Sequence, residues 1–158
     1  MNDWAERLDD LDARKAAARE MGGPDKIAKQ HDRGSLTARE RIDHLLDPGS
    51  FRELGPLVGA VPADALITGW GRIDGRPVLV GAEDFTVLGG SIGPGNTSKR
   101  YRVAELALQE RVPLVMVLDG AGHRPAMPGD PVHTRAPSDL LAQARLAGHV
   151  PFVTAVLG

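Results

Sequence analysis

Val112-Pro113-Leu114-Val115-Met116-Val117-Leu118-Asp119-Gly120-Ala121-Gly122-His123 is the stretch of sequence that decides the fold. Its first seven residues form a continuous apolar run, which is typical of a strand buried on both faces of a parallel sheet. A helical pattern at Ser138–Gly148 and a second apolar run at Phe152–Leu157 come next along the chain. Strand, helix and strand in this order predict a right-handed parallel crossover, with the second strand buried like the first. We therefore expect an α/β fold.

Upstream of this crossover, two strand-like segments surround a hairpin turn. Ala65–Ile73 and Arg76–Ala82 flank Asp74-Gly75, and both turn residues tolerate the positive φ angles of a type I′ turn. Phe51–Val58 is expected to add a further strand. Between the hairpin and the crossover, residues 97–110 show the 3.6-residue apolar period of a helix, which begins after a glycine-rich segment.

Helical patterns fill much of the N-terminal third. Residues 3–20 form a charged helix with a narrow apolar stripe, and Met21-Gly22-Gly23-Pro24 ends it. A second helix begins at Thr37, because Thr37 and Glu40 form a capping box in which each side chain satisfies an amide at the helix start. The block from His31 to Phe51 is therefore expected to be a basic arm followed by a short amphipathic helix.

The composition excludes several classes of protein. Nineteen Lys and Arg against 21 Asp and Glu give a formal net charge of −2, which argues against an electrostatic nucleic-acid binder. The absence of Cys excludes disulfides, thiolate zinc sites and cysteine nucleophiles. No apolar run approaches the roughly 20 residues that span a bilayer, and the polar N-terminus is not a signal peptide. We expect a cytoplasmic protein without nucleic-acid or membrane partners.

Two glycine-rich patterns suggest chemistry that their flanking residues argue against. Gly89–Gly93 matches G-x-S-x-G, which would make Ser91 the nucleophile of a serine hydrolase. Such an elbow needs a helix that starts at once, whereas Pro94-Gly95 follows here, so a plain connector is favoured. Gly90–Thr97 imitates a phosphate-binding P-loop, but Asn96 stands where the phosphate-binding Lys is required.

The helix after this segment carries Lys99, Arg100 and Arg102 in its first turns. Cations are disfavoured there by the positive end of the helix dipole. A bound anion such as a phosphate would explain them, because helix N-termini with nearby cations hold phosphates well. A solvated basic face explains them equally well, so both interpretations stay open.

A second candidate site lies just past the buried strand, at Leu118–Arg124. Ligands of such sheets bind beyond the carboxyl ends of the strands, and the glycines here let the backbone aim N–H groups into a cleft, as in an oxyanion hole. A tight turn without a ligand explains the same residues, and spacing alone favours it. His123, Asp130 and His133 share one loop, but their spacing fits no zinc pattern, so no metal site is expected.

Two neighbouring stretches carry a family resemblance. Residues 30–42, Gln-His-Asp-Arg-Gly-Ser-Leu-Thr-Ala-Arg-Glu-Arg-Ile, and residues 45–51, Leu-Leu-Asp-Pro-Gly-Ser-Phe, resemble the N-terminus of carboxyltransferase β subunits of biotin-dependent acyl-CoA carboxylases. Those include the propionyl-CoA and methylcrotonyl-CoA carboxylase types. The similarity continues at residues 69–76 and 84–91, and it covers nearly the whole chain from about Lys26.

The resemblance implies a crotonase-like fold, in which two related α/β domains with stacked sheets assemble into a ring of dimers. It implies transfer of a carboxyl group from carboxybiotin to the α-carbon of an acyl-CoA, with biotin as the base and backbone amides holding the thioester enolate. The implied partners are acyl-CoA, a biotin carboxyl carrier or biotin carboxylase subunit, and sister subunits or the remainder of the carboxyltransferase. No cofactor is expected in this chain itself, because biotin is delivered by a carrier.

The family's first oxyanion loop commonly reads Asp-Ser-Gly-Gly-Ala-Arg, and residues 119–124 read Asp-Gly-Ala-Gly-His-Arg at the matching place. Gly122 and His123 are therefore the candidate backbone donors, with His123 replacing the usual Ala. The bulkier side chain is expected to narrow the acyl pocket or add a proton donor. Lys99 matches a family Lys and is implied as a CoA-phosphate contact. Four more residues are expected near CoA or biotin: Gly89, Gly90, Ser91 and Ala121.

Since family members use two domains, we expect residues 1–25 to be a helix and linker and residues 26–158 to be a partial carboxyltransferase domain, truncated at its C-terminus. The chain alone is expected to be inactive. Two alternatives stay open: a non-catalytic assembly or regulatory partner of a full-length carboxyltransferase, and a serine hydrolase that uses Ser91.

Overall fold

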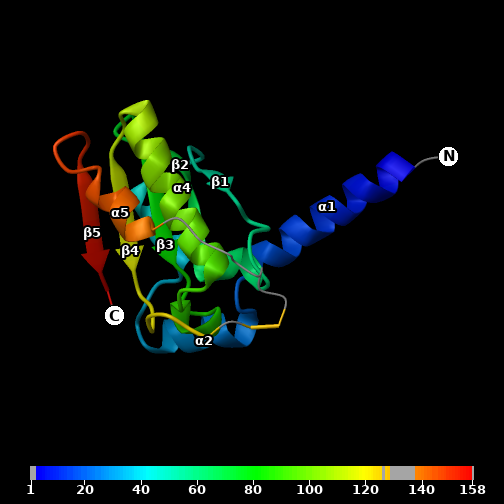
Figure 1. The fold of residues 1–158 in the computed structure, drawn as a ribbon. Helices are drawn as coiled ribbons and strands as arrows, with labels where there is room; N and C mark the ends of the chain where they lie inside the picture. Colours follow the sequence, from blue (N-terminus) through cyan, green and yellow to red (C-terminus); the bar gives the residue numbers. More distant parts are fainter. Residues whose placement is uncertain (1–2, 126, 129–137, 158) are drawn as a thin grey trace.

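A five-stranded mixed sheet forms the centre of the molecule in the computed structural model, which describes residues 3–125, 127–128 and 138–157 (Figure 1). The strands lie side by side in chain order. The pairs β1–β2 and β2–β3 are antiparallel, whereas β4 runs parallel to both β3 and β5. Their bounds are β1 Arg52–Leu54, β2 Leu66–Ile73, β3 Arg76–Glu83, β4 Leu114–Leu118 and β5 Phe152–Val156.

Helices cover both faces of this sheet. The described helices are α1 Asp3–Arg19, α2 Pro24–Asp32, α3 Ala38–Leu45, α4 Pro94–Glu110 and α5 Asp139–Ala144, with short 3₁₀ turns η1 Pro62–Ala65 and η2 Leu88–Gly90. Helix α1 projects away from the body, so its apolar residues Trp4 and Leu8 are largely exposed (Figure 1). None of the described helices has the length and apolar composition needed to cross a membrane.

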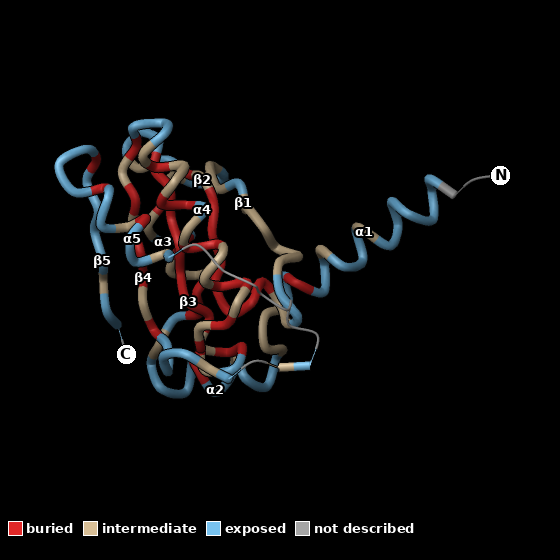
Figure 2. The backbone as a smooth tube through the Cα atoms, in the orientation of Figure 1, coloured by how far each residue is buried: buried red, intermediate tan, exposed pale blue. Residues whose placement is uncertain are grey.

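The core lies on the two faces of the sheet, as the buried centre in Figure 2 shows. Successive strand residues point to opposite faces, so Leu79 packs with Val103 of α4 while Val80 packs with Ile42 of α3. Leu79, Val80 and Ile42 are fully buried. The sheet is thus covered by α4 and α5 on one side and by α3 on the other.

Several elements predicted from the sequence are confirmed. Asp74 and Gly75 have φ angles of 51° and 74°, as a type I′ turn between β2 and β3 requires. The Thr37 side chain accepts a hydrogen bond from the Glu40 N–H, and the Glu40 carboxylate accepts one from the Thr37 N–H, which completes the predicted capping box at the start of α3. The parallel pairing of β4 with β5 is also as predicted.

Two helix predictions were wrong. Helix α4 begins at Pro94 instead of residue 97, because Pro is well suited to the first helical position, where no amide donor is needed. Helix α2 was missed: Pro24 was taken to end a helix, whereas here it opens a new one, and the basic arm predicted from His31 begins inside α2. The predicted boundary at residue 25 also falls within this helix.

The prediction of a buried second parallel strand was also wrong. Val153 and Val156 of β5 are 54% and 70% exposed, and Leu140 of the neighbouring α5 is 72% exposed. The reason is that β5 is the last strand of the sheet, with β4 on one side only. Among the described residues, α5 and β5 therefore present an apolar surface to solvent.

Candidate functional site

Two glycine-containing loops lie side by side beyond β3 and β4. These strands are parallel, so their carboxyl ends meet at the same edge of the sheet, where ligands of such sheets bind. The Ala121 N–H donates to Gly89 O at 2.9 Å, and the Ile92 N–H donates to Gly122 O at 2.8 Å. The structure thus brings together the two segments, 88–92 and 119–124, that the sequence suggested separately.

Glycine is required where the two backbones touch. A Cβ on Gly90 would lie 2.3 Å from Asp119 O, and a Cβ on Gly120 would lie 2.6 Å from Gly90 O. Both distances are far shorter than a carbon–oxygen contact allows, and backbone atoms cannot move aside cheaply. The loops are therefore held at a separation that only glycine at both positions permits.

Gly122 and His123 present their N–H groups away from this contact. A parallel bridge joins Ile92 to His123, in which Ile92 bonds to Gly122 O and to the Arg124 N–H. In such a bridge the N–H of His123 points away from Ile92. Gly122 has a left-handed φ of 86°. Both residues are exposed, and neither amide donates a backbone hydrogen bond to another described residue.

Asp119, the first residue of this loop, is anchored from both helices of the N-terminal block. Arg41 of α3 places Nη1 2.7 Å from Asp119 Oδ2, and Gln30 of α2 donates from Nε2 to the same oxygen at 3.3 Å. The Asp119 N–H in turn donates to Glu83 Oε2 at 2.7 Å. Residues 30–41 therefore hold the loop start in place.

A second buried contact joins Glu83 to helix α4. Arg100 donates from Nη2 to Glu83 Oε1 and from Nε to Asn96 Oδ1, the latter at 2.7 Å. Burial raises the pKa of Glu83, and the nearby Arg100 charge opposes this effect. Arg100, one of the three cations for which a bound anion and a solvated basic face were both open, is instead buried and neutralised by an internal carboxylate.

Lys99, another of those cations, is buried. Its Nζ donates to Ala63 O, inside the turn η1, at 3.0 Å and to Leu66 O, directly after the turn. Burial lowers the pKa of Lys99 to about 8, because the charged form loses solvation. A phosphate would have to displace these carbonyl oxygens, so the predicted CoA-phosphate contact of Lys99 stays a prediction.

The turn η1 has an unusual backbone. Ala63, Asp64 and Ala65 have φ angles of 47°, 47° and 58°, in the left-handed region that non-glycine residues avoid. Each such residue costs roughly 1–2 kcal/mol, and strain of this kind tends to cluster at functional sites. The turn directs the Asp64 carboxylate to the first turn of α4, where it accepts the Asn96 N–H at 2.6 Å.

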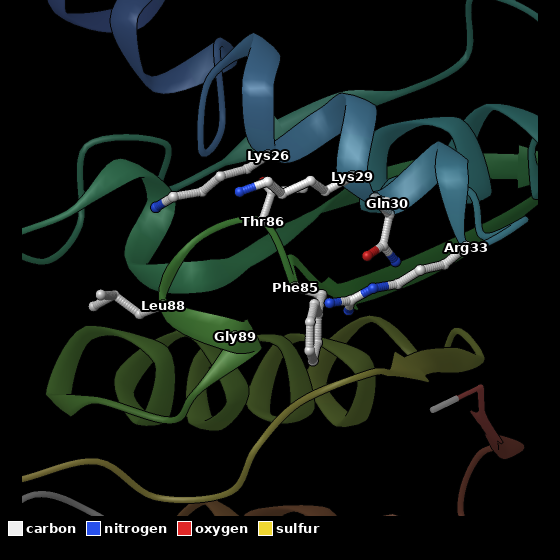
Figure 3. A pocket seen from close by; sticks show the side chains of 8 residues that line it. All are labelled: Lys26, Lys29, Gln30, Arg33, Phe85, Thr86, Leu88 and Gly89. Atoms are coloured by element: carbon white, nitrogen blue, oxygen red, sulfur yellow. The ribbon is translucent and has the colours of Figure 1, made fainter.

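A cavity with three cations lies beside the 88–92 loop. Figure 3 shows Lys26, Lys29 and Arg33 extending from α2 and its C-cap toward Phe85 and Leu88. The Arg33 guanidinium lies 5.5 Å from the centre of the Phe85 ring, within range of a cation–π contact. The cavity therefore combines positive charge with an aromatic face.

A neighbouring cavity lies beside the second loop. The two share Gln30, Arg33 and Phe85, and the second is further lined by Gly120 and Ala121. The two cavities thus border the same three side chains, one on the side of the α2 cations and the other on the side of Gly120 and Ala121. An extended ligand with an anionic end could contact both cavities at once.

The other sequence-derived candidates show no catalytic arrangement. Ser91 is buried in an extended conformation, with φ −68° and ψ 146°, and among the described residues none is hydrogen-bonded to its hydroxyl. No group of three potential metal ligands occurs in the described part of the chain. Asp130 and His133 lie outside the described residues, so the histidine loop considered in the sequence is not tested.

Comparisons with known proteins show which family the chain belongs to. The model of the carboxyl transferase domain family matches residues 29–158. The chain belongs to this family. It is 42% identical over 130 residues to a propionyl-CoA carboxylase carboxyltransferase subunit of Haloferax mediterranei, covering 75% of this chain and 25% of that protein. It is 44% identical over 135 residues to a propionyl-CoA carboxylase beta chain of Roseobacter denitrificans, covering 78% of this chain and 26% of that one.

Solved structures of this family share the fold. A transcarboxylase 12S structure with hydrolysed methylmalonyl-coenzyme A bound gives a TM-score of 0.83 at 32% identity, covering all of this chain and 33% of that one. A single-chain, multi-domain long-chain acyl-CoA carboxylase gives 0.79 at 35% identity, covering 94% of this chain and 17% of that one. The predicted family and crotonase-like α/β fold are confirmed, and the chain spans about a quarter of the length of the curated relatives quoted above.

Sequence reasoning missed part of the site. Lys26, Lys29, Gln30 and Arg33 recur at the spacing of one helix face, which would have predicted the cationic cavity if α2 had been recognised. Asp64 gave no such signal. It lies 60 residues from Arg124 in the sequence, and only the folded chain brings their side chains together.

Proposed function

We propose that this chain binds an acyl-CoA and supports transfer of a carboxyl group from carboxybiotin to its α-carbon. The observation that carries the proposal is the pair of N–H groups at Gly122 and His123, which donate no backbone hydrogen bond to the described residues and directly follow the loop residues Gly120 and Ala121 that line a cavity. These amides would donate to the thioester oxygen, where negative charge develops when the α-carbon loses its proton. The membership of the carboxyl transferase family supports this reaction class.

The cationic cavity would hold the nucleotide end of the acyl-CoA. CoA carries a diphosphate and a further phosphate, and Lys26, Lys29 and Arg33 supply matching positive charge. Phe85 offers its ring to the adenine. The pantetheine arm would then extend along the second cavity toward Gly122 and His123. Gly89, Gly90, Ser91 and Ala121 would form the wall between the two ends, which agrees with their expected place near CoA or biotin.

Biotin enters this proposal only as a substrate carried by another protein or domain, where it supplies the carboxyl group. The chain's own contribution is to hold the thioester oxygen and to orient the α-carbon. His123 stands where relatives commonly have Ala, so its imidazole would narrow the acyl end of the site. A cytoplasmic location, an oligomeric assembly and a biotin carboxyl carrier as partner are part of the same proposal.

The test is the affinity of the purified chain for propionyl-CoA by isothermal titration calorimetry. Lys29→Glu is expected to weaken binding by about tenfold, because it replaces attraction to a phosphate by repulsion. Lys15→Glu reverses a charge on α1, away from these two cavities, and is the matched control. Equal affinity of wild type and Lys29→Glu, or no binding by wild type, would refute the assignment of the cavities.

A second role is favoured by the apolar surface on α5 and β5. Exposed Leu140, Val153 and Val156 form a surface of the kind that is normally covered by another polypeptide segment. The chain would then act as an assembly or regulatory partner of a longer carboxyltransferase. Native mass spectrometry of the purified protein separates these roles when followed by an assay. A second polypeptide that restores carboxylation indicates a split enzyme, and a complex without gained activity indicates the non-catalytic role.

A further inference from the structure

Asp64 and Arg124 form a buried ion pair that joins separate parts of the site. Arg124 donates from Nη2 to Asp64 Oδ1 and from Nη1 to Ser91 O, the latter at 2.7 Å. The other Asp64 oxygen accepts the Asn96 N–H at 2.6 Å. Both side chains are buried, with exposures of 0% for Asp64 and 8% for Arg124. One carboxylate thus connects η1, the start of α4 and the end of the 119–124 loop.

Three glycines leave the space that this pair occupies. A Cβ on Gly93 would lie 2.2 Å from Arg124 Nη2, and one on Gly95 would lie 2.8 Å from Asp64 Oδ2. A Cβ on Gly59 would lie 2.5 Å from the Asp64 Cβ. Any side chain at these positions would displace the pair. Gly93 of the elbow-like pattern and Gly95 of the P-loop-like pattern are thus explained by the Asp64–Arg124 contact.

The strained turn η1 serves the same contact. Its three left-handed residues place Asp64 where no ordinary turn of this sequence would. Lys99 holds the turn from inside through Ala63 O and Leu66 O. Backbone strain persists only where the surrounding structure over-determines it, and here the surrounding contacts all converge on Asp64.

The pair fixes one end of the segment that carries the free amides. Arg124 follows His123 directly, and its N–H bonds to Ile92 O at 3.1 Å while its side chain holds Ser91 O. At the other end, Ala121 bonds to Gly89 O. The segment 121–124 is therefore attached to the 88–92 loop through Ala121, through the Gly122 carbonyl and through Arg124, and only Arg124 adds a side-chain contact.

We propose that Asp64 and Arg124 are positioning residues for a carbonyl group bound at the amides of Gly122 and His123. The proposal rests on the proposed function, because it assigns a task to the same amides. Donors polarise a carbonyl only within a narrow distance range, so a small loop displacement removes polarisation. Binding of the CoA nucleotide, in the cationic cavity beside α2, does not depend on that distance. The pair therefore controls polarisation and leaves affinity nearly unchanged.

The experiment is isotope-edited infrared spectroscopy of propionyl-CoA labelled with ¹³C at the thioester carbonyl, bound to the full chain. In wild type, hydrogen bonds from the two amides are expected to move the carbonyl band to lower frequency. Arg124→Met is expected to remove at least about half of this shift while affinity falls by less than about threefold. Arg124→Lys, which keeps one donor group, is expected to restore part of the shift. Arg102→Met, on the exposed face of α4, is the matched control.

Each alternative outcome is decisive. A full shift in Arg124→Met overturns the positioning role and leaves the proposed function standing. Loss of affinity in step with the shift also overturns it, because that indicates general disruption. A wild type that binds without any shift refutes the oxyanion assignment and this proposal with it. If Arg124→Met does not fold, the double variant Asp64→Asn with Arg124→Met, which leaves no unpaired buried charge, is judged by the same criteria.

Discussion

Arg41 Nη1 lies 2.7 Å from Asp119 Oδ2, and the two side chains are each 9% exposed. This contact connects the stretch that carried the family resemblance, residues 30–42, to the loop that carries the candidate oxyanion amides. It gives a physical reason for the resemblance to be strong in helices that lie far from the 119–124 loop in sequence. These helices hold Asp119, and Asp119 begins the loop.

Replacing Arg41 with Met should therefore destabilise the chain strongly. The substitution leaves the Asp119 carboxylate buried without its cation, and breaking such a pair costs about 3–5 kcal/mol. Urea unfolding followed by circular dichroism measures the change in the free energy of unfolding. The double variant Arg41→Met with Asp119→Asn should recover most of the loss, since no buried charge is then left unpaired. A loss below about 1 kcal/mol for Arg41→Met, as for an exposed pair, would contradict the structural role.

A prediction on pH follows from the capping box of α3. The hydrogen bond from His31, followed by that from the Thr37 N–H, lowers the pKa of Glu40 to about 2 from 4.5. Because the folded pKa lies below the unfolded one, this contribution to stability is present above about pH 4.5 and is lost as the pH falls toward 2. Its size is about 1 kcal/mol, kept small by solvent screening of a side chain that is 40% exposed.

Comparison of wild type with Glu40→Gln tests this effect, because Gln keeps the size of the side chain and removes its charge. The free energies of unfolding should differ at pH 6 and converge at pH 2. A difference that stays constant over this range would show that the Glu40 charge plays no part.

Two features of the fold that depend on residues close together in the sequence were predicted correctly. Two features that depend on packing between distant residues were not. The Asp74-Gly75 turn and the Thr37–Glu40 capping box are set by neighbours within three residues, and both were predicted correctly. Helix α2 was missed because Pro24 ends one helix and starts another equally well, and only packing decides between these roles. Burial of β5 was mispredicted because apolar composition does not reveal which strand lies at a sheet edge.

The candidate site divides in the same way. Gly122 and His123 were proposed from a loop sequence that resembles a family motif, and the structure gives them free amides without testing their role. Asp64 could not have been found, since its significance depends on three left-handed residues and on Arg124, far along the chain. The charge of Lys99 made it a candidate in the sequence, whereas its contacts with two carbonyl oxygens depend on the fold and give no sequence signal.

Gly22 gives a further prediction, at the contact between α2 and the turn after β3. A Cβ there would lie 2.0 Å from Thr86 O, and the Gly22 N–H donates to Thr86 Oγ1 at 2.9 Å. Gly22→Ala should therefore displace α2, lower the free energy of unfolding by about 1–3 kcal/mol and weaken propionyl-CoA binding. Thr86→Ala adds no clash but removes this hydrogen bond and the one from Thr86 Oγ1 to Asp84 Oδ1, and should cost about 1–2 kcal/mol without displacing α2. Equal weakening of propionyl-CoA binding by the two variants would rule out a steric origin.

Lys99 gives a second prediction on pH, with the same sign as that for Glu40 but in the alkaline range. Burial lowers the pKa of Lys99 to about 8, whereas the unfolded chain keeps a value near 10.5. Between these values the unfolded state binds more protons than the native state, so stability should rise with pH across this window, by up to about 3 kcal/mol. The neutral amine still has two N–H groups, one for Ala63 O and one for Leu66 O, so deprotonation need not break the turn.

Urea unfolding of wild type and Lys99→Met at pH 7, 8, 9 and 10 separates this contribution from the titration of other groups. The chain has no Cys, so thiol chemistry does not complicate the alkaline range. Lys99→Met carries no charge at any pH, and the wild-type free energy of unfolding should therefore increase relative to it from pH 8 upward. Parallel curves for the two proteins would mean that Lys99 titrates as it does in the unfolded chain, and that its ammonium is not confined against η1.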